Sequence, residues 1–219
     1  MKSLLSWIMR HRARRLTRRI AVHFPSSGRI ADIGSGTGHN AQMWRQQPGL
    51  TVDEFDVADL HWVGDGPTLF DGSVIPAPEA DYDVATLLFV LQYPADPLSL
   101  LREAKRISKG RVIVLQSTYE STWGRFWLRL RGFVWGSLAF HLARWMRVIR
   151  FQDCPLDNRR VYSRPELRTL FTQAGLTIQS WEPQEWHRLN ISRDLYRLEA
   201  ISSDLTFRSS FPPATKSGG

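Results

Sequence analysis

The sequence predicts an α/β fold in which a mostly parallel β-sheet is covered by helices on both faces. Short runs of β-branched and apolar residues alternate with segments of helical periodicity between residues 28 and 120. A glycine-rich run directly follows the first predicted strand, and an aspartate ends the second. Strands and helices that alternate in this way indicate βαβ units, whose parallel strands are buried on both faces.

Each predicted element follows from its own local pattern. Apolar and β-branched runs predict strands at Arg29–Ile33, Thr51–Val57, Asp83–Phe89, Arg111–Gln116, Leu176–Trp181 and Leu195–Ile201, the last two as an antiparallel pair. Apolar residues at helical spacing predict helices at 3–23, His39–Gln47, Pro97–Ser108 and Pro165–Ala174. The first helix is amphipathic, because Ile8, Leu16 and Ile20 recur on one face and Arg10, Arg14 and Arg18 line another.

Length and composition fit one globular domain in a reducing compartment. The chain has 219 residues, and its single cysteine, Cys154, excludes an intramolecular disulfide framework. The six histidines show no metal-ligand spacing, so we predict no metal site. The longest charge-free stretch near the middle, Gly132–Ala143, is too short to cross a bilayer, which takes about 20 apolar residues.

The formal net charge of +8 is unevenly distributed. Residues 1–29 contain eight Lys or Arg residues and no acid, whereas residues 30–119 contain twelve acids and six bases. Residues 120–150 are basic again, with six arginines and one glutamate. Both basic segments are also rich in large apolar residues. This pairing suits an anionic membrane surface at least as well as a nucleic acid.

The same patterns divide the chain into segments. We expect an N-terminal amphipathic basic helix at residues 1–27 and the main α/β domain at residues 28–201. Within that domain, residues 122–151 are dominated by Trp, Phe, Leu and Arg and are predicted to form a helical cap or insert. Residues 202–219 have no periodic pattern and are predicted to be a disordered tail.

The glycine-rich run Gly34-Ser35-Gly36-Thr37-Gly38 separates the first predicted strand from the next helix. Glycine has no Cβ and tolerates positive φ, so a ligand can approach the backbone of such a turn closely. The run also fits the dinucleotide fingerprint, with Ala41 in its last position. By itself, therefore, it does not select a ligand.

Three aspartates narrow the choice. Asp32 lies two residues before the first glycine, where a carboxylate disfavours a pyrophosphate and suits a cationic amino group. Asp56 ends the second strand about 20 residues after the loop, where an acid can accept hydrogen bonds from both ribose hydroxyls. Asp71 follows the next crossover, where its carboxylate can accept a hydrogen bond from an adenine amine.

With these residues, the sequence resembles the class I S-adenosylmethionine (SAM)-dependent methyltransferases, in particular those that act on small molecules and lipid quinones. The resemblance covers about residues 28–118. The matching segments follow in the family's order: Asp32–Gly38, Asp56, Asp71-Gly72, Ile75-Pro76, Asp81–Val84, Leu87–Tyr93, Asp96-Pro97, Leu101–Ile107 and Gly110–Val114.

Two departures bear on the chemistry. Gln92 and Tyr93 stand where many members carry histidine, which leaves a catalytic role for that position open. No Asn-Pro-Pro-Tyr-like motif is present, which argues against methylation of amino groups on nucleic-acid bases or glutamine.

The resemblance implies a Rossmann-like class I methyltransferase fold, with a mostly parallel seven-stranded sheet flanked by helices and the helical insert after the fifth strand. It also implies that SAM is the cofactor. Residue by residue, the implied SAM-binding positions are Asp32, Gly34, Ser35, Gly36, Thr37, Gly38, Asn40, Asp56, Val57, Asp71, Gly72 and Leu87.

Catalysis needs little from the protein beyond positioning and desolvation, because the methyl group of SAM is already activated. A base is needed only where the acceptor must lose a proton. The candidate bases are His141, His187, Tyr119 and Tyr162. The alternative for each is an interfacial or hydrogen-bonded side chain without a catalytic role.

The insert is the best indication of the methyl acceptor. Arg125 and Arg129 fall on one side of a helical wheel, while Trp123 and Trp127 suit a lipid–water boundary. This pattern fits a lid that lies on a membrane over a hydrophobic site. It equally fits a cap helix packed on the domain or on a second subunit.

We therefore expect methyl transfer to a hydrophobic small molecule: a quinone, a lipid or an aromatic natural product. An RNA methyltransferase and a catalytically silent SAM-fold binding module are the alternatives, and nucleic acid is the less favoured partner. The expected location is the cytoplasm, with peripheral contact to an anionic membrane. The sequence predicts no oligomeric state.

Overall fold

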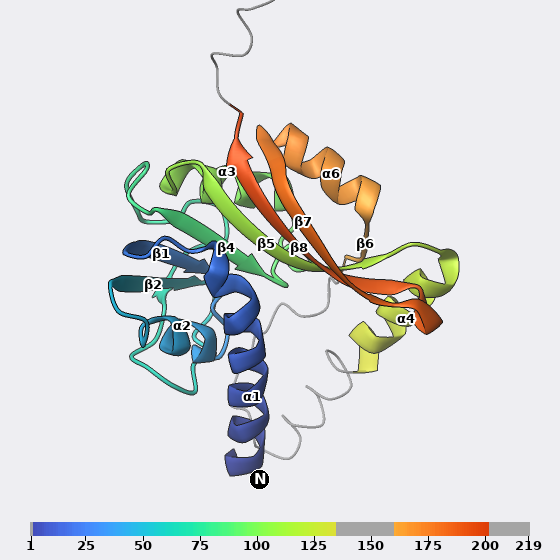
Figure 1. Ribbon diagram of the computed structural model, residues 1–219, viewed down its shortest axis with the longest axis horizontal. Coiled ribbons are helices and arrows are strands. Elements are labelled where there is room, and N and C mark those ends of the chain that lie inside the picture. Colours follow the sequence, from blue (N-terminus) through green and yellow to red (C-terminus); the bar gives the residue numbers. More distant parts are fainter. Residues whose placement is uncertain (1, 135–159, 202–219) are drawn as a thin grey trace, which may run out of the picture.

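A single twisted β-sheet runs through the molecule, with helices on both of its faces (Figure 1). The computed structural model describes residues 2–134 and 160–201, with residues 2–6 described by their backbone alone. The second half of the predicted insert, the predicted tail at 202–219, and His141 therefore lie outside the described residues. The α/β layering predicted from the sequence is confirmed.

Seven strands form the sheet in the order β3-β2-β1-β4-β5-β8-β7. Neighbouring strands from β3 to β5 pair in parallel, whereas β8 runs antiparallel to both β5 and β7. A further two-residue strand, β6 (Tyr162–Ser163), pairs with the end of β5. The strand bounds are β1 Gly28–Ile33, β2 Leu50–Asp56, β3 Thr68–Leu69, β4 Val84–Leu88, β5 Arg111–Tyr119, β7 Leu176–Trp186 and β8 Ile191–Ala200.

The helices cover the two faces of the sheet in pairs. One face packs against α1 and α2, and the other packs against α3 and α6 (Figure 1). The fifth described α-helix, α4, follows β5 and contacts β8 and the short helix η3. The bounds are α1 Lys2–Ile20, η1 Ala21–His23, α2 His39–Trp44, α3 Pro97–Ile107, α4 Thr122–Gly132, α6 Arg164–Gln173 and η3 His187–Leu189.

Strand β1 shows how the core is divided between the two faces. Its side chains alternate in direction, so Ile30 packs with Ile20 of α1 and Trp44 of α2. Ala31 and Ile33 belong instead to the cluster that the α3 and α6 side chains complete. All five side chains are fully buried. A strand buried on both faces explains the near-continuous apolar run in the sequence.

Most predicted elements are confirmed, and the differences have local causes. The segment between the predicted strands Thr51–Val57 and Asp83–Phe89 contains β3, whose two residues are both exposed and too few to show a period. Strands β7 and β5 extend beyond their predicted ends at Trp181 and Gln116, because polar residues continue the pairing with β8. The predicted helix at 3–23 ends in the 3-10 turn η1, and α2 ends at Trp44 instead of Gln47.

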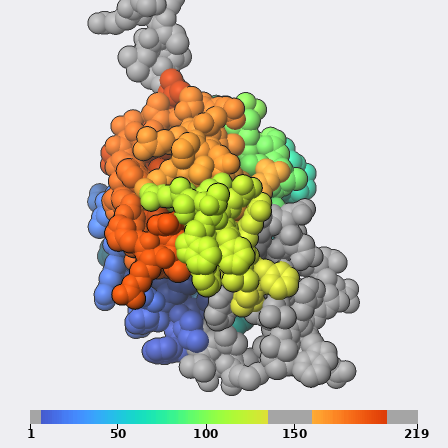
Figure 2. Space-filling view, turned by 90° about the vertical axis from the view of Figure 1, so that its right-hand side faces the viewer, coloured from blue at the N-terminus to red at the C-terminus, as the bar shows by residue number. Residues whose placement is uncertain are grey.

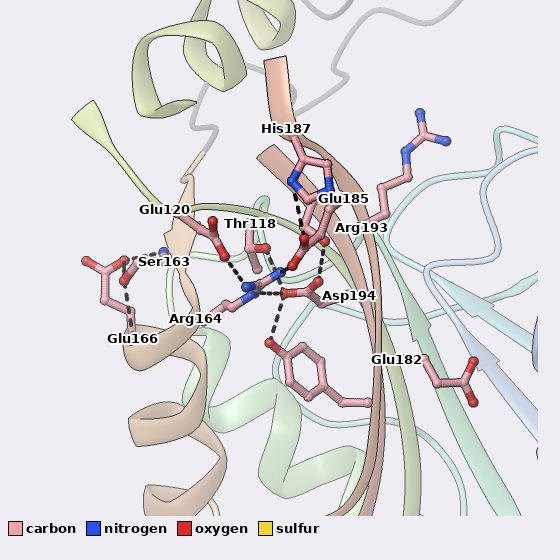
Figure 3. Close-up of polar contacts among 12 residues, drawn as sticks. Thr118, Glu120, Ser163, Arg164, Glu166, Glu182, Glu185, His187, Arg193 and Asp194 are labelled. Atoms are coloured by element: carbon pink, nitrogen blue, oxygen red, sulfur yellow. Dashed lines mark hydrogen bonds and ion pairs between the residues drawn. The ribbon is translucent and has the colours of Figure 1, made fainter. Parts of the chain in front are cut away.

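A buried ionic cluster ties α6 to β5, β7 and β8 (Figure 3). The Asp194 carboxylate is fully buried and accepts hydrogen bonds from Arg164 Nε at 2.9 Å and Thr118 Oγ1 at 2.8 Å. Arg164 also pairs with Glu120 and Glu185. Arg193, which precedes Asp194 on β8, points away from this cluster to the other side of the strand (Figure 3). The cluster therefore sets which side of the sheet receives the Arg193 guanidinium.

No helix in the described parts of the chain combines the length and apolar character that a membrane crossing requires.

Candidate active site

The glycine-rich run forms a tight loop between β1 and α2, with each of its three glycines at positive φ. A Cβ on Gly34 would lie 2.4 Å from Val90 Cγ2, and one on Gly38 would lie 2.5 Å from the Val63 carbonyl oxygen. A Cβ on Gly36, with φ of +59°, would meet nothing within 4 Å. The loop is therefore packed at both ends and open in the middle, as a cradle for a ligand must be.

Asp56 holds the open part of this loop in place. Its Oδ2 accepts a hydrogen bond from the Gly36 amide at 2.9 Å, and its Oδ1 accepts one from the Val57 amide at 2.7 Å. Burial raises the pKa of Asp56, while these amide bonds oppose the rise. An ionised carboxylate can accept about four hydrogen bonds, so Asp56 keeps acceptor capacity for ligand hydroxyls.

Asp71 lies beside Asp56 because β3 pairs with the end of β2, with Leu69 opposite Asp56. Asp71 closes a turn by accepting hydrogen bonds from the amides of Ser73 at 2.9 Å and Val74 at 3.1 Å. Hydrogen bonds from the Ser73 side chain and from these amides lower the pKa of Asp71 to about 2. Its exposed carboxylate is therefore ionised across the physiological range.

Asp32 is a buried carboxylate with unused acceptor capacity. Its Oδ1 accepts a hydrogen bond from Thr86 Oγ1 at 2.9 Å, whereas its Oδ2 is buried and has no hydrogen-bond partner within residues 2–134 and 160–201. Burial and the nearby carboxylates of Glu54 and Asp56 together raise the pKa of Asp32 to about 7, against the opposing effect of the Thr86 hydrogen bond. A cation bound beside Asp32 relieves this cost, whereas an anion adds to it.

Glu54, Arg45 and His61 form a supporting layer that the sequence analysis did not single out. The Glu54 carboxylate is buried and contacts Arg45 Nη1 at 2.6 Å and His61 Nε2 at 2.7 Å. The His61 ring in turn packs against Gly38. The available signal was an acid on the inward side of a predicted strand, which requires a partner when it is buried.

The remaining predicted cofactor residues lie around the loop. Ser35 is buried and its hydroxyl has no partner among the described residues, while Thr37 Oγ1 lies 3.0 Å from His39 Nδ1. Asn40 is half-buried on α2, and Val57 Cγ1 lies 3.4 Å from the position of a Gly72 Cβ. The side chain of Leu87 is fully buried in the core. The structure thus brings most of the set together, and their contacts with SAM stay predictions.

A pocket of about 780 Å³ lies next to this loop, at the carboxyl ends of β4 and β5. Phe89, which follows β4, lines it, and its neighbour Val90 packs on Gly34. Phe89 has a φ of +60°, a conformation that costs a non-glycine residue free energy and that clusters at functional sites. The pocket also receives side chains from α1, α4 and β8.

The three described candidate bases do not line this pocket. Tyr162 donates its hydroxyl hydrogen to the Leu91 carbonyl at 2.7 Å, and burial raises its pKa. Tyr119 contacts Glu166 at 3.4 Å, and His187 is exposed in the turn between β7 and β8. A catalytic role for any of them stays a prediction.

The sequence matches a protein family over residues 7–180, and that family is described as a methyltransferase domain. The chain belongs to this family. It is a SAM-dependent methyltransferase domain, as the resemblance implied. No curated protein matches the sequence.

Solved structures agree on the fold at low sequence identity. A SAM-dependent methyltransferase from Methanosarcina mazei has a TM-score of 0.57 and 15% identity, over 83% of this chain and 96% of that one. Magnesium protoporphyrin IX methyltransferase from Synechocystis PCC 6803, solved with bound S-adenosylhomocysteine (SAH), has a TM-score of 0.54 and 14% identity, over 88% of this chain and 84% of that one. Geranyl diphosphate C-methyltransferase from Streptomyces coelicolor A3(2), also solved with SAH, has a TM-score of 0.61 and 11% identity, over 87% of this chain and 80% of that one.

The geometry of this methyltransferase fits SAM. The open space over Gly36 allows a ligand to lie against the backbone of the loop, and Asp56 keeps hydrogen-bond acceptor capacity for ligand hydroxyl groups. The unpartnered Oδ2 of Asp32, among other carboxylates, favours a ligand that carries positive charge. SAM carries both a sulfonium and an ammonium group, whereas the pyrophosphate of a dinucleotide brings only negative charge to the same loop.

Replacing Asp56 with alanine should lower the affinity for SAM by at least about tenfold, the equivalent of one hydrogen bond to a charged group. The variant loses the acceptor for ligand hydroxyls and the bond that orients Gly36. Isothermal titration calorimetry with SAM, SAH and NAD measures the effect. Asp65→Ala, which removes an exposed acid from the following loop, is the matched control. Unchanged SAM affinity in a folded Asp56→Ala protein would refute the site.

Asp32→Asn should stabilise the SAM-free protein in a pH-dependent way. The pKa of Asp32 rises from 3.8 to about 7 on folding. Ionisation of Asp32 therefore destabilises the folded state: the free energy of unfolding falls as the pH rises from about 4 to about 7 and stays at the lower value above that. Asparagine carries no charge to bury. The variant's Tm should therefore exceed that of the wild type by several degrees at pH 8 and by much less at pH 4, while its SAM affinity falls. A Tm difference that is independent of pH would contradict the assignment.

Proposed function

We propose that this methyltransferase transfers the methyl group of SAM to a hydrophobic small molecule bound in the pocket beside the glycine loop. The observation that carries the proposal is the position of the pocket, at the ends of β4 and β5 and one residue from the Val90–Gly34 contact. Trp7, Phe89 and Phe133 contribute apolar surface to its walls. A volume of about 780 Å³ is in the range of small-molecule sites.

The protein's part in the reaction is to bring two ligands together and to exclude water. SAM supplies a methyl group that is already activated. In this proposal Asp32, Asp56 and the glycine loop hold the cofactor; the contact of Val90 with Gly34 and the position of Phe89 in the pocket wall support it. Positioning of this kind can account for a large part of a rate enhancement without a dedicated base.

The methyl acceptors after which two structural relatives are named support a hydrophobic small molecule as the acceptor of this protein. Magnesium protoporphyrin IX and geranyl diphosphate each combine a large apolar part with polar groups, and both enzymes share this fold. Enzymes that share this sheet order and loop act on a wide range of acceptors. The proposal for this chain therefore depends more on the pocket than on the fold.

Transfer of a radiolabelled methyl group from SAM tests the proposal. We expect label in a solvent-extractable product from at least one member of a panel of hydroquinones, phenols and fatty acids, and none with the Asp56→Ala variant. Label that enters only added RNA, with binding that weakens steeply as salt rises, would support the RNA methyltransferase instead. Tight SAM binding without transfer to any acceptor would support a silent binding module.

Peripheral contact with an anionic membrane is a second part of the proposal. It is supported by exposed aromatic side chains on α1, on α4 and at the C-cap of α4: Trp7, Trp123, Phe126 and Phe133 are each more than half exposed. Helix α4 lies on the face shown in Figure 2, beside the β7–β8 hairpin, and carries Arg125 and Arg129 as well. Exposed aromatic rings next to basic side chains are typical of helices that lie in a lipid interface.

Vesicle flotation tests the membrane contact. The protein should float with phosphatidylglycerol vesicles and not with phosphatidylcholine vesicles, since both charge and apolar insertion contribute. Trp123→Ser with Phe126→Ser should abolish flotation, because these two stacked rings are the most exposed large apolar side chains of α4. Equal binding to both vesicle types, or none to either, would count against a membrane role.

A further inference from the structure

The pocket beside the glycine loop is strongly basic. Six arginines from different parts of the chain line it: Arg12, Arg15, Arg129, Arg131, Arg160 and Arg193. The described residues of its wall include no aspartate or glutamate. Arg164, by comparison, pairs with three carboxylates outside this pocket.

Arg193 reaches the pocket from β8 and lies against two aromatic rings. Its guanidinium lies 4.4 Å from the centre of the Trp186 ring and 6.0 Å from that of Phe89. Its Nε is buried and has no hydrogen-bond partner among the described residues. Arg12, on α1, lies over the same Phe89 ring at 5.3 Å. Guanidinium groups from α1 and β8 therefore both lie near one aromatic side chain, Phe89, at the end of β4.

The electrostatic environment of Arg193 is unfavourable without a counter-charge. Burial, together with repulsion from Arg131, Arg12, Arg15 and Arg19, lowers the pKa of Arg193 to about 10. In the part of the chain that the structure describes, the largest influences on this pKa are burial and these four arginines. Clusters of like positive charge are characteristic of sites that bind an anion. The anion offsets both the desolvation of the guanidinium groups and their mutual repulsion.

A large part of the remaining wall is apolar, which makes a bare inorganic ion a poor match for the pocket. Trp7, Ile8, Leu128 and Phe133 complete the pocket around the arginines. A small ion such as phosphate would satisfy the charges and leave this apolar surface in contact with water. A ligand with one charged end and a large apolar body covers both kinds of surface.

We propose that the pocket binds an amphipathic oxyanion, a carboxylate or phosphate attached to an apolar or aromatic body, and that the methyl acceptor belongs to this class. The proposal rests on the function proposed above and narrows it: a neutral quinone or phenol is not the expected acceptor. Arg193 and Arg12 bind the anionic group, and the aromatic walls bind the body. Bidentate hydrogen bonding makes guanidinium groups well suited to such oxyanions.

Equilibrium binding of two matched probes tests the charge requirement directly. With SAH present and in 0.15 M salt, 1-naphthyl phosphate should bind at least about tenfold more tightly than 1-naphthol, and inorganic phosphate alone should bind more weakly than the naphthyl ester. Arg193→Gln and Arg12→Gln should each weaken naphthyl phosphate by about tenfold and leave naphthol unchanged. Equal binding of the ester and the alcohol would overturn the proposal.

Matched controls separate the pocket from the overall charge of the protein. Arg14→Gln and Arg197→Gln remove the same charge from α1 and β8 at exposed positions that do not line the pocket. Neither should change the affinity for naphthyl phosphate. If they weaken it as much as the pocket variants do, the effect is one of net charge and the proposal fails. Arg12→Gln changes an exposed residue of α1, so it serves as the test should Arg193→Gln not fold.

A further arm separates a soluble anion from a lipid headgroup. Phosphatidylglycerol vesicles should not displace 1-naphthyl phosphate, because the pocket takes a whole small molecule into its interior. Displacement by these vesicles, lost in the Arg12→Gln variant, would instead identify the pocket as a lipid-headgroup site and overturn the assignment to a soluble acceptor.

The binding readout keeps this inference distinct from the proposed function. Arginine-dependent binding of naphthyl phosphate without methyl transfer to any acceptor would leave the pocket assignment standing and refute the proposed activity. Methyl transfer to a neutral acceptor, unaffected by Arg193→Gln, would support the activity and refute the anionic class.

Discussion

The parallel pairing of β1 with both β2 and β4 is the constraint on which the site depends. Ile33 lies opposite Phe55 on one side and Leu87 on the other, so the three strands end at the same edge of the sheet. The glycine loop, Asp56 and Val90 come directly after these ends and therefore meet. A slip of one residue would reverse the direction of every side chain, and Asp32 would no longer contact Thr86.

Much of this arrangement could be predicted from the sequence because its signals are local. The run before Gly34 is apolar since β1 is buried on both faces, and the distance from Gly36 to Asp56 is one helix and one strand. Parallel strands joined by a helix share an edge, so the acid at the end of the second strand must lie near the loop after the first. Gly36 and Asp56 are in fact joined by a hydrogen bond of 2.9 Å.

The features that escaped prediction depend on contacts between distant parts of the chain. Strand β3 has two residues, which is too short for a hydrophobic period, and only its pairing with Asp56 defines it. Arg193 was one basic residue near a predicted final strand. Its significance arises from Phe89 and Arg12, more than 100 residues away in the sequence, and no local pattern records that proximity. Glu54 is an exception, because Arg45 at the C-cap of α2 and His61 lie only nine and seven residues away; no local pattern distinguishes them from the other polar residues nearby.

The pocket takes its walls from α1 and from β8, which are separated by almost the whole described sequence. The contacts of the glycine loop, from Asp32 to Val90, close within a much shorter part of the chain. Translation delivers the chain from its N-terminus at about 5–20 residues per second. On a ribosome, the cofactor loop can thus acquire its partners many seconds before Arg193 emerges. The nascent protein would pass through an interval in which it can hold a methyl donor but has nowhere to place an acceptor.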